Sequence, residues 1–340
     1  MKIAFLSHHL EAIRKVIEGG KNMKAEPQAL SGGVKKRKKG KFVQYFKQFD
    51  LQLMVIPGLL FILVFNYIPM YGVLMSFQDY NIFEGMMKSE WVGLKHFSMF
   101  FNDPRFVEIM RNTIVLSLFK ILICFPAPIL LALMLNEIKN MAFKRTVQTV
   151  TYLPHFLSWV IVAGFAMSML STDNGSLNMA LEKLNIIDEP INFLSKPEYF
   201  WTIIVTTNLW KTIGFNSIVF MAAIAGVSPQ LYEAASLDGA SRFKQMFLVT
   251  IPSIMPIIVI FMILEIGNLL NAGFEDLLLL GDAAILRSVS DVIDTYVYRV
   301  GIGSARYSYA TAIGLFKAVI SVGLLTLANY LARRSGNSLW

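Results

Sequence analysis

Charged residues and cysteines are scarce in this chain, and each shortage excludes a class of protein. Only 16% of the 340 residues are Asp, Glu, Lys or Arg, whereas soluble proteins carry roughly 25%. The single cysteine, Cys124, excludes an intrachain disulfide framework and a cysteine metal cluster. The four histidines are scattered, and neither a zinc-protease HExxH motif nor a phosphate-binding GxxxxGKS/T motif occurs. The sequence therefore predicts no metal site, no nucleotide site and no catalytic residues.

Long apolar segments take the place of the missing charge. Hydrophobic residues make up 55% of the chain, and the mean hydropathy is +0.54. About 20 apolar residues in a helix cross a hydrocarbon layer of roughly 30 Å. These features predict an all-α polytopic membrane protein with six transmembrane helices in a lipid bilayer. The six segments lie at approximately 51–76, 112–135, 150–170, 200–226, 253–280 and 307–331.

The net charge of +8 is distributed as in a membrane protein rather than a nucleic-acid-binding one. Six basic residues between Lys35 and Lys41 precede the first span, and Arg333 and Arg334 follow the last. Basic residues are retained on the cytoplasmic side, although such clusters also attract anionic lipids. We therefore expect a basic cytoplasmic segment at 1–48, which lacks the pattern of a signal peptide. A transmembrane domain should follow at 49–340, with both termini cytoplasmic.

A polar stretch, EAASLDGASRFKQMFLVTIPSIMP, interrupts the apolar sequence from residue 233. Ser228 and Pro229 predict a helix start, with a side-chain cap from Ser228. The helix should end at Leu237, and Gly239 suits a sharp turn. A second helix is predicted from Arg242 to Val249, stopping before Pro252. Phe243 and Phe247 would share one face of it and pack back onto the bundle.

This stretch closely resembles the EAA loop of permease subunits from bacterial ABC importers. The resemblance implies a type I ABC importer permease fold in which the loop, residues 228–252, joins the permease to its ATPase partner. The positions that match the loop are Glu233, Ala234, Ala235, Asp238, Gly239 and Ala240, followed by Pro252.

Two further passages, 66–81 and 294–317, resemble the maltose-permease-type sugar branch and, within it, the subfamily for complex oligosaccharides and polysaccharides. The resemblance implies a translocation subunit in the cytoplasmic membrane and not an enzyme. It implies a second permease subunit in a heterodimer, two ATPase subunits that bind ATP and Mg, and an extracytoplasmic solute-binding protein. It implies no cofactor in this chain and no nucleic-acid partner.

Polar side chains inside the spans are the candidates for a sugar path, because such groups are costly in lipid and face the protein interior. The resemblance places the family's binding positions in the same stretches. Lys211 could pair with a uronate carboxylate, pair with Glu265, or extend to the interface, and Lys120 also lies in a span. The candidates are Asn208, Trp210, Lys211, Thr212, Phe215 and Asn216 before the loop, and Glu265, Asn268, Asn271 and Phe274 after it.

Other functions remain open at this stage. An ABC permease for an acidic sugar or an amino acid would share most of these features. A membrane-embedded polysaccharide-modifying enzyme would need clustered acids, and the nearest are Glu275 with Asp276 and Asp291 with Asp294. A scaffold without a substrate would not explain the loop.

Overall fold

The computed structural model describes residues 49–334, 336, 338 and 339, so the predicted basic segment 1–48 lies outside the described residues. Contacts divide the chain into two compact units, Met1–Asn66 and Tyr67–Trp340. In the first unit, helix α3 (Phe49–Ile62) leads into the π-helical turn η1 (Leu63–Tyr67), which ends at the unit boundary.

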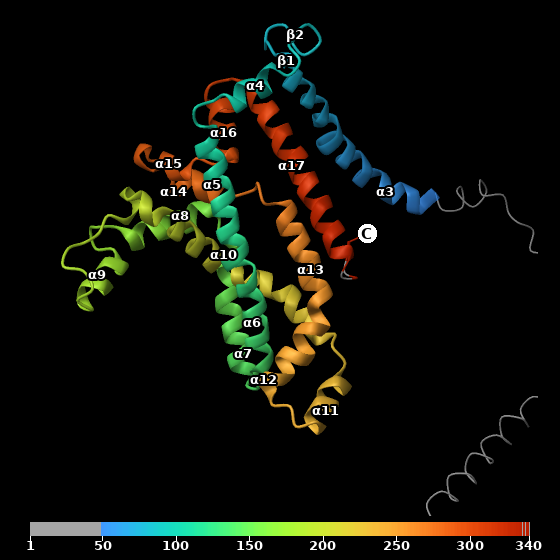
Figure 1. Cartoon of the computed structure of the whole chain (residues 1–340), viewed down its shortest axis with the longest axis vertical. Helices are drawn as coiled ribbons and strands as arrows, with labels where there is room; N and C mark the ends of the chain where they lie inside the picture. Colours follow the sequence, from blue (N-terminus) through green and yellow to red (C-terminus); the bar gives the residue numbers. More distant parts are fainter. Residues whose placement is uncertain (1–48, 335, 337, 340) are drawn as a thin grey trace, which may run out of the picture. The chain divides into compact units, whose positions relative to one another are not determined.

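The second unit is built mainly from helices, and its described strands form one short hairpin (Figure 1). In the hairpin, β1 (Gln78–Asp79) pairs antiparallel with β2 (Glu90–Trp91). The helices and helical turns are, in chain order, η2 (Ile68–Phe77), α4 (Lys95–Phe101), α5 (Phe106–Phe119), η3 (Lys120–Cys124), α6 (Pro126–Glu137), α7 (Met141–Tyr152), η4 (Leu153–Phe156), α8 (Trp159–Leu170), α9 (Ser176–Lys183), η5 (Phe193–Ser195), α10 (Pro197–Ala225), α11 (Pro229–Leu237), α12 (Arg242–Gln245), η6 (Met246–Thr250), α13 (Ile251–Gly267), α14 (Glu275–Leu280), η7 (Ala284–Leu286), α15 (Arg287–Ser290), α16 (Ile293–Tyr298), η8 (Arg299–Gly303) and α17 (Tyr307–Arg333).

Four helical stretches are long and apolar enough to cross a membrane: Leu53–Phe77, Phe106–Glu137, Arg242–Gly267 and Tyr307–Arg333. Two further pairs of helices meet the same criterion only together, because each pair is bent sharply at a short break. The bend is 106° between η4 and α8, and 71° between α10 and α11. If each bent pair is one span, the described residues contain the six predicted transmembrane segments.

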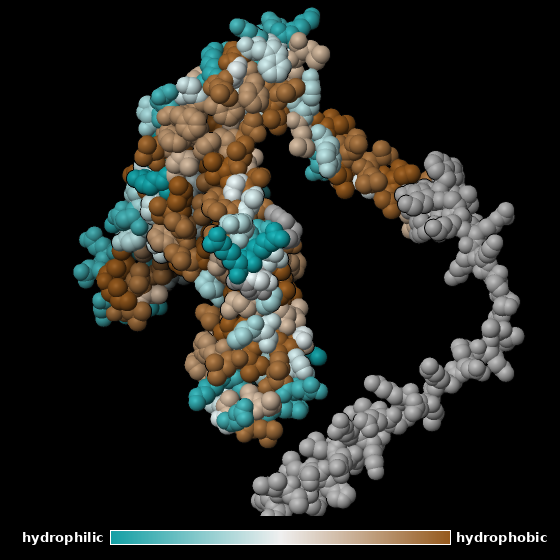
Figure 2. Space-filling model, turned by 45° about the vertical axis from the view of Figure 1, so that its right-hand side comes forward, coloured by the Kyte–Doolittle hydropathy of each residue, from teal (hydrophilic) through white to brown (hydrophobic). Residues whose placement is uncertain are grey.

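The surface of the second unit suits a hydrocarbon environment. Figure 2 shows apolar side chains over much of the visible helical surface, with hydrophilic residues at the upper and lower tips and in smaller patches at mid-height and along the left side. Large apolar side chains such as Leu122 and Met134 are 67% and 68% exposed. Extended apolar surfaces of this kind mark contact with a membrane or another protein.

The span predicted over 253–280 begins and ends earlier than expected. α12, η6 and α13 run on as one helix, so the prediction that a helix stops before Pro252 is wrong. Pro252 lies in the first turn of α13, directly after the π-helical turn, where its missing amide is tolerated. Beyond Gly267 the chain forms a non-helical connector, residues 268–274, before the short helix α14 begins.

The predicted span 150–170 is broken at residues 157 and 158, between η4 and α8, and a lysine from another helix binds at the break. Lys211 of α10 is buried, and its ammonium donates to the carbonyl oxygens of His155 at 2.9 Å and Leu157 at 2.5 Å. A helix break frees carbonyl groups that lipid cannot satisfy. An ammonium has three donors, and Lys211 therefore stabilises the bend between η4 and α8.

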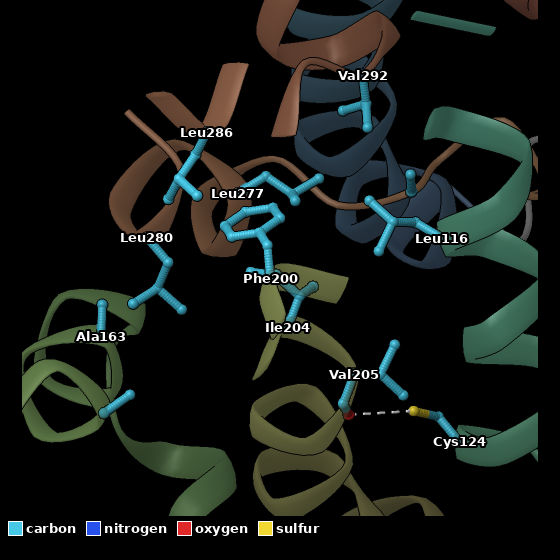
Figure 3. Packing of buried hydrophobic residues seen from close by; sticks show 12 residues of the cluster. Leu116, Cys124, Ala163, Phe200, Ile204, Val205, Leu277, Leu280, Leu286 and Val292 are labelled. Atoms are coloured by element: carbon cyan, nitrogen blue, oxygen red, sulfur yellow. Dashed lines mark hydrogen bonds between the residues drawn. The ribbon is translucent and has the colours of Figure 1, made fainter. Parts of the chain in front are cut away.

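Close packing around α10 holds the second unit together. Figure 3 shows Phe200 of α10 beside Leu277 of α14 and above Ile204, at the centre of a buried apolar cluster. Because lipid is as apolar as these side chains, close contact rather than exclusion of water stabilises such a cluster. Gly214 allows α10 to approach α7, since a Cβ atom there would lie 2.1 Å from the carbonyl oxygen of Thr151.

Candidate functional site

The predicted coupling loop consists of two helices joined by a tight turn. α11 ends in a Schellman motif, in which the amide of Ala240 donates to Ala235 O at 2.9 Å and the amide of Gly239 donates to Ser236 O at 3.1 Å. Gly239 has a φ of +76°, which favours glycine, so it makes the predicted turn. The six predicted coupling residues lie on α11 and in this turn: Glu233, Ala234, Ala235, Asp238, Gly239 and Ala240.

The exposed face of the loop is more apolar than the sequence suggests. Glu233 and Asp238 are exposed, and beside them Leu237 is 90% exposed and Phe243 is 69% exposed. The prediction that Phe243 and Phe247 pack back onto the bundle is wrong. Their ring centroids lie 4.9 Å apart, and both rings face outward. The loop therefore presents two acids and a group of apolar side chains at its surface.

Polar contacts attach the loop to the spans that flank it. The hydroxyls of Tyr232 on α11 and Thr250 in η6 lie 3.0 Å apart, and Thr250 is buried. Arg242 forms an ion pair with Glu137 at the end of α6, at 3.6 Å. Ser228 occupies the N-cap position of α11, but its side chain does not make the predicted capping hydrogen bond. The loop is therefore connected to both α6 and the start of α13, so a force on it would reach two spans.

A cavity of about 320 Å³ lies between η3, α6, α10 and α13, and we call it the central cavity. Five of the ten substrate-path candidates line it, namely Asn208, Thr212, Phe215, Asn216 and Glu265. The ring of His155 stacks on Phe215 with centroids 3.8 Å apart, which fixes that aromatic face. The complete lining is Lys120, Cys124, Phe125, Pro128, Asn208, Thr212, Phe215, Asn216, Val219, Phe220, Phe261 and Glu265. Aromatic faces and hydrogen-bonding groups thus occur together, as a sugar ring requires.

Lys120, which lines the central cavity, belongs to an ion pair that was not predicted from the sequence. Lys120 donates to Asp276 at 2.8 Å and to the carbonyl oxygen of Ala272 at 2.6 Å. The side chain of Asp276 is only 3% exposed, and a buried carboxylate without a partner costs several kcal/mol. The sequence contains a lysine and an aspartate in separate apolar segments. This pattern predicts an ion pair, but it does not identify the two residues that form it.

Two of the remaining candidates point away from the central cavity. Trp210 stacks on Phe165 of α8, with ring centroids 5.8 Å apart. The ammonium of Lys211 bonds main-chain carbonyl groups at the break between η4 and α8, as described above. The expectation that Lys211 pairs with Glu265, or extends to the interface, is therefore wrong, because its donors are used by buried carbonyl groups.

The last three candidates, Asn268, Asn271 and Phe274, lie in the connector beyond α13. The side-chain amide of Asn271 donates to Asn268 at 3.3 Å. The carbonyl oxygen of the Asn271 side chain accepts from Lys317 of α17, which also donates to Asp294 of α16. The structure therefore separates the two asparagines from the central cavity and joins them to a second polar cluster.

A third polar cluster lies at the end of the second unit far from the coupling loop, near α4 and α16 (Figure 1). The hydroxyls of Tyr296 and Tyr309 lie 2.6 Å and 3.2 Å from the same oxygen of Asp103. Burial raises the pKa of Asp103, but the hydrogen bond from Tyr296 and the charge of Arg105 outweigh it and hold the pKa below its usual value. Burial and donation to Asp103 raise the pKa of Tyr296. This ionised carboxylate ties the α4–α5 connection to α16 and α17.

The acids considered for catalysis serve as structural links. Arg299 donates to Asp291, which also accepts a hydrogen bond from Thr295. Within the described residues, no group of His, Cys, Asp and Glu side chains could hold a metal ion. Three of the four acids considered for catalysis are ion-paired with a basic residue: Asp276 with Lys120, Asp291 with Arg299, and Asp294 with Lys317.

Known proteins are similar to this chain in sequence and in fold. Residues 125–337 match the family described as binding-protein-dependent transport system inner membrane component. The polygalacturonan/rhamnogalacturonan transport system permease protein YteP of Bacillus subtilis (strain 168) is 43% identical over 318 residues, which covers 93% of this chain and 98% of that protein. Protein LplB of the same organism is 45% identical over 284 residues, or 84% of this chain and 88% of that protein.

Solved structures agree with the sequence relatives. In the crystal structure of a bacterial alginate ABC transporter in complex with an alginate pentasaccharide-bound periplasmic protein, one chain superimposes with a TM-score of 0.80. Its sequence is 38% identical, and the match covers 88% of this chain and 99% of that chain. A second crystal structure, of a transporter for the acidic polysaccharide alginate, matches with a TM-score of 0.79 at 38% identity over 86% of this chain and 98% of that chain.

Proposed function

The chain belongs to the family of binding-protein-dependent transport system inner membrane components, and from this premise we propose that it carries acidic oligosaccharides or polysaccharides along a path that includes its central cavity. It is a multi-pass membrane permease subunit of a sugar or polysaccharide ABC importer, and not an enzyme. The observation that carries the substrate proposal is the lining of the central cavity, where an ammonium, amide groups and aromatic rings converge.

Lys120 is the group that we assign to a substrate carboxylate. The names of two relatives include polygalacturonan and alginate, which are polymers of uronic acids. An ammonium has three donors, and Lys120 uses two of them, for Asp276 and for the carbonyl oxygen of Ala272. The third donor remains for a ligand, and Lys120 lines the central cavity. A charge-assisted hydrogen bond from it to a uronate would be stronger than a neutral one.

The remaining polar groups of the central cavity suit sugar hydroxyls. Glu265 can accept hydrogen bonds from hydroxyls but repels a carboxylate, so it would orient the uronate group toward Lys120. Asn208 and Asn216 each offer donors and an acceptor. Phe215, held by His155, presents a fixed aromatic face for the C–H surface of a ring. Each residue therefore has a role that a uronic acid unit can use.

The partners follow from the family. We assign this chain to a heterodimer with a second permease subunit, two ATPase subunits that bind ATP and Mg, and an extracytoplasmic binding protein. Both termini and the coupling loop would face the cytoplasm. The Schellman turn at Gly239 and the exposed side chains of Glu233, Leu237 and Phe243 would dock into the ATPase. Closure of the ATPase pair would then move α6 and α13 through the contacts of Arg242.

The test replaces the cavity ion pair by a neutral pair. Lys120→Gln with Asp276→Asn keeps hydrogen-bonding groups without leaving a buried charge unpaired. Uptake is measured in proteoliposomes with the complete transporter, its binding protein, and either an oligogalacturonate or the same oligomer reduced to neutral galactose units. For each sugar, the ratio of the variant rate to the unmodified rate removes the contribution of the binding protein. We expect the oligogalacturonate ratio to fall at least tenfold, because hydrogen bonds to charged groups contribute roughly 1.5–3 kcal/mol.

A matched control uses an exposed ion pair. Lys95 and Asp79 lie 3.1 Å apart on the surface of the second unit, and Lys95→Gln with Asp79→Asn should leave both uptake ratios near one. Equal losses for the acidic and neutral oligomers in the Lys120 double variant would show that the pair only stabilises the fold. No loss for either oligomer would remove Lys120 from the substrate path.

A further inference from the structure

A second cavity, of about 550 Å³, lies beyond the end of α13, and we call it the distal cavity. We propose that the distal cavity is a second saccharide subsite, so that a polymer occupies it and the central cavity at the same time. This inference rests on the proposed function, because it concerns the same transported chain of sugars. Five residues that line the distal cavity support this proposal: Asn271, Gly273, Phe274, Asp294 and Tyr298.

Two aromatic rings form a corner of the distal cavity. The centroids of Phe274 and Tyr298 lie 5.2 Å apart, with an angle of 65° between the ring planes. Tyr298 is 44% exposed, so its ring is available to a ligand. Two rings at a steep angle offer an apolar face to a sugar ring and a second surface beside it. The cavity also falls within the 300–1,000 Å³ that is typical of small-molecule sites.

Polar groups are fixed directly beside this aromatic corner. Lys317 donates to both Asn271 and Asp294, so the two acceptors are held in place by one ammonium. Lys317 forms an ion pair with one carboxylate oxygen of Asp294. Among the described residues, the other oxygen of Asp294 has no hydrogen-bond partner. That oxygen and the second amide hydrogen of Asn271 can bond sugar hydroxyls. The ammonium of Lys317 offsets the charge of Asp294, so this carboxylate does not exclude an acidic sugar unit.

The distal cavity lies close to the central one. Gly273 lines the distal cavity, and Lys120 lines the central cavity. A Cβ atom on Gly273 would lie 2.4 Å from an oxygen of Asp276 and 2.8 Å from the ammonium of Lys120. Gly273 of the distal cavity therefore lies directly beside the ion pair that contains Lys120 of the central cavity, so the two cavities are neighbours. A polymer has units to place in both cavities, whereas a short oligomer does not.

The test compares substrate lengths. Uptake of a galacturonate dimer and of a galacturonate hexamer is measured in proteoliposomes that contain the complete transporter and its binding protein. Tyr298→Ala should raise the KM for the hexamer about tenfold, which corresponds to about 1.4 kcal/mol, and leave the KM for the dimer unchanged. Tyr298→Phe keeps the ring and should restore the KM for the hexamer. As a matched control, Tyr330→Ala removes an exposed tyrosine near the end of α17 and should change neither value.

The failure of this inference is distinct from the failure of the proposed function. Phe215→Ala in the central cavity should impair the dimer and the hexamer alike if the proposed function holds. If Phe215→Ala impairs both oligomers but Tyr298→Ala changes neither, the distal cavity is not a subsite and the proposed function stands. If Tyr298→Ala impairs both oligomers equally, the residue supports the fold or a common step, and the second subsite is refuted. If Phe215→Ala has no effect on either oligomer, the central cavity itself is not part of the path.

Discussion

Replacing Lys211 by methionine should destabilise the protein without changing its choice of sugar. Methionine has a similar length but no donor, so the carbonyl groups at the break between η4 and α8 lose their partner. The ammonium makes two short hydrogen bonds, at 2.9 Å to His155 and 2.5 Å to Leu157, and a longer one of 3.4 Å to Pro154.

The magnitude follows from these contacts. Hydrogen bonds to charged groups contribute roughly 1.5–3 kcal/mol each, but polar contacts between transmembrane helices average about 0.6 kcal/mol in measured cycles. Two short bonds then give between about 1 kcal/mol and about 6 kcal/mol for Lys211. The assay is thermal unfolding of the purified complex in detergent, together with uptake of an acidic and a neutral oligosaccharide. We expect the Tm to fall by several degrees and both uptake rates to fall together.

Two further variants test whether Lys211 stabilises the helix break. Lys183→Met removes an exposed lysine at the end of α9 and should leave the Tm unchanged. Adding Glu265→Gln to Lys211→Met should not restore stability, because the two side chains line different regions of the molecule. An unchanged Tm with a selective loss of acidic sugar would contradict this structural role and return Lys211 to the substrate path. Recovery in the double variant would show instead that Lys211 and Glu265 interact.

Three further outcomes are expected. Gly239→Ala should destabilise the Schellman turn by about 1–2 kcal/mol and lower substrate-stimulated ATP hydrolysis. Gly226→Ala should do neither, because Gly226 lies just before α11 with an ordinary negative φ. Equal hydrolysis in both variants would show that the turn has no role in coupling. The lowered pKa of Asp103 means that its ionised form stabilises the folded state fully above about pH 4, and that this contribution is lost as the pH falls through the lowered value. Asp103→Asn should therefore reduce the Tm at neutral pH, and the difference from the unmodified protein should shrink on strong acidification; a pH-independent difference would contradict the assignment. Cysteine at Ser288 should react with an impermeant thiol reagent in intact cells and cysteine at Gln230 only after permeabilisation, and the reverse pattern would invert the topology.

The local pattern of the sequence was sufficient for the class of protein, the six apolar segments and the turn at Gly239. Hydrophobic length and the conformational freedom of glycine are properties of a short stretch of chain, and they do not depend on what that stretch contacts. The orientation of Phe243 and Phe247 was predicted wrongly. Helical spacing shows that the two rings share a face of the helix, but it does not show which way that face points.

Only the tertiary structure decided which charges meet. Lys211 and Lys120 look alike in sequence, since each is a lone lysine in an apolar segment. Lys211 lies against a helix break and bonds main-chain carbonyl groups, whereas Lys120 faces Asp276 from a distant part of the chain. The partner of a buried charge depends on which helices pack side by side and where each one bends. Those features follow from contacts along whole helices, such as the approach of α10 to α7 at Gly214, and no local pattern contains them.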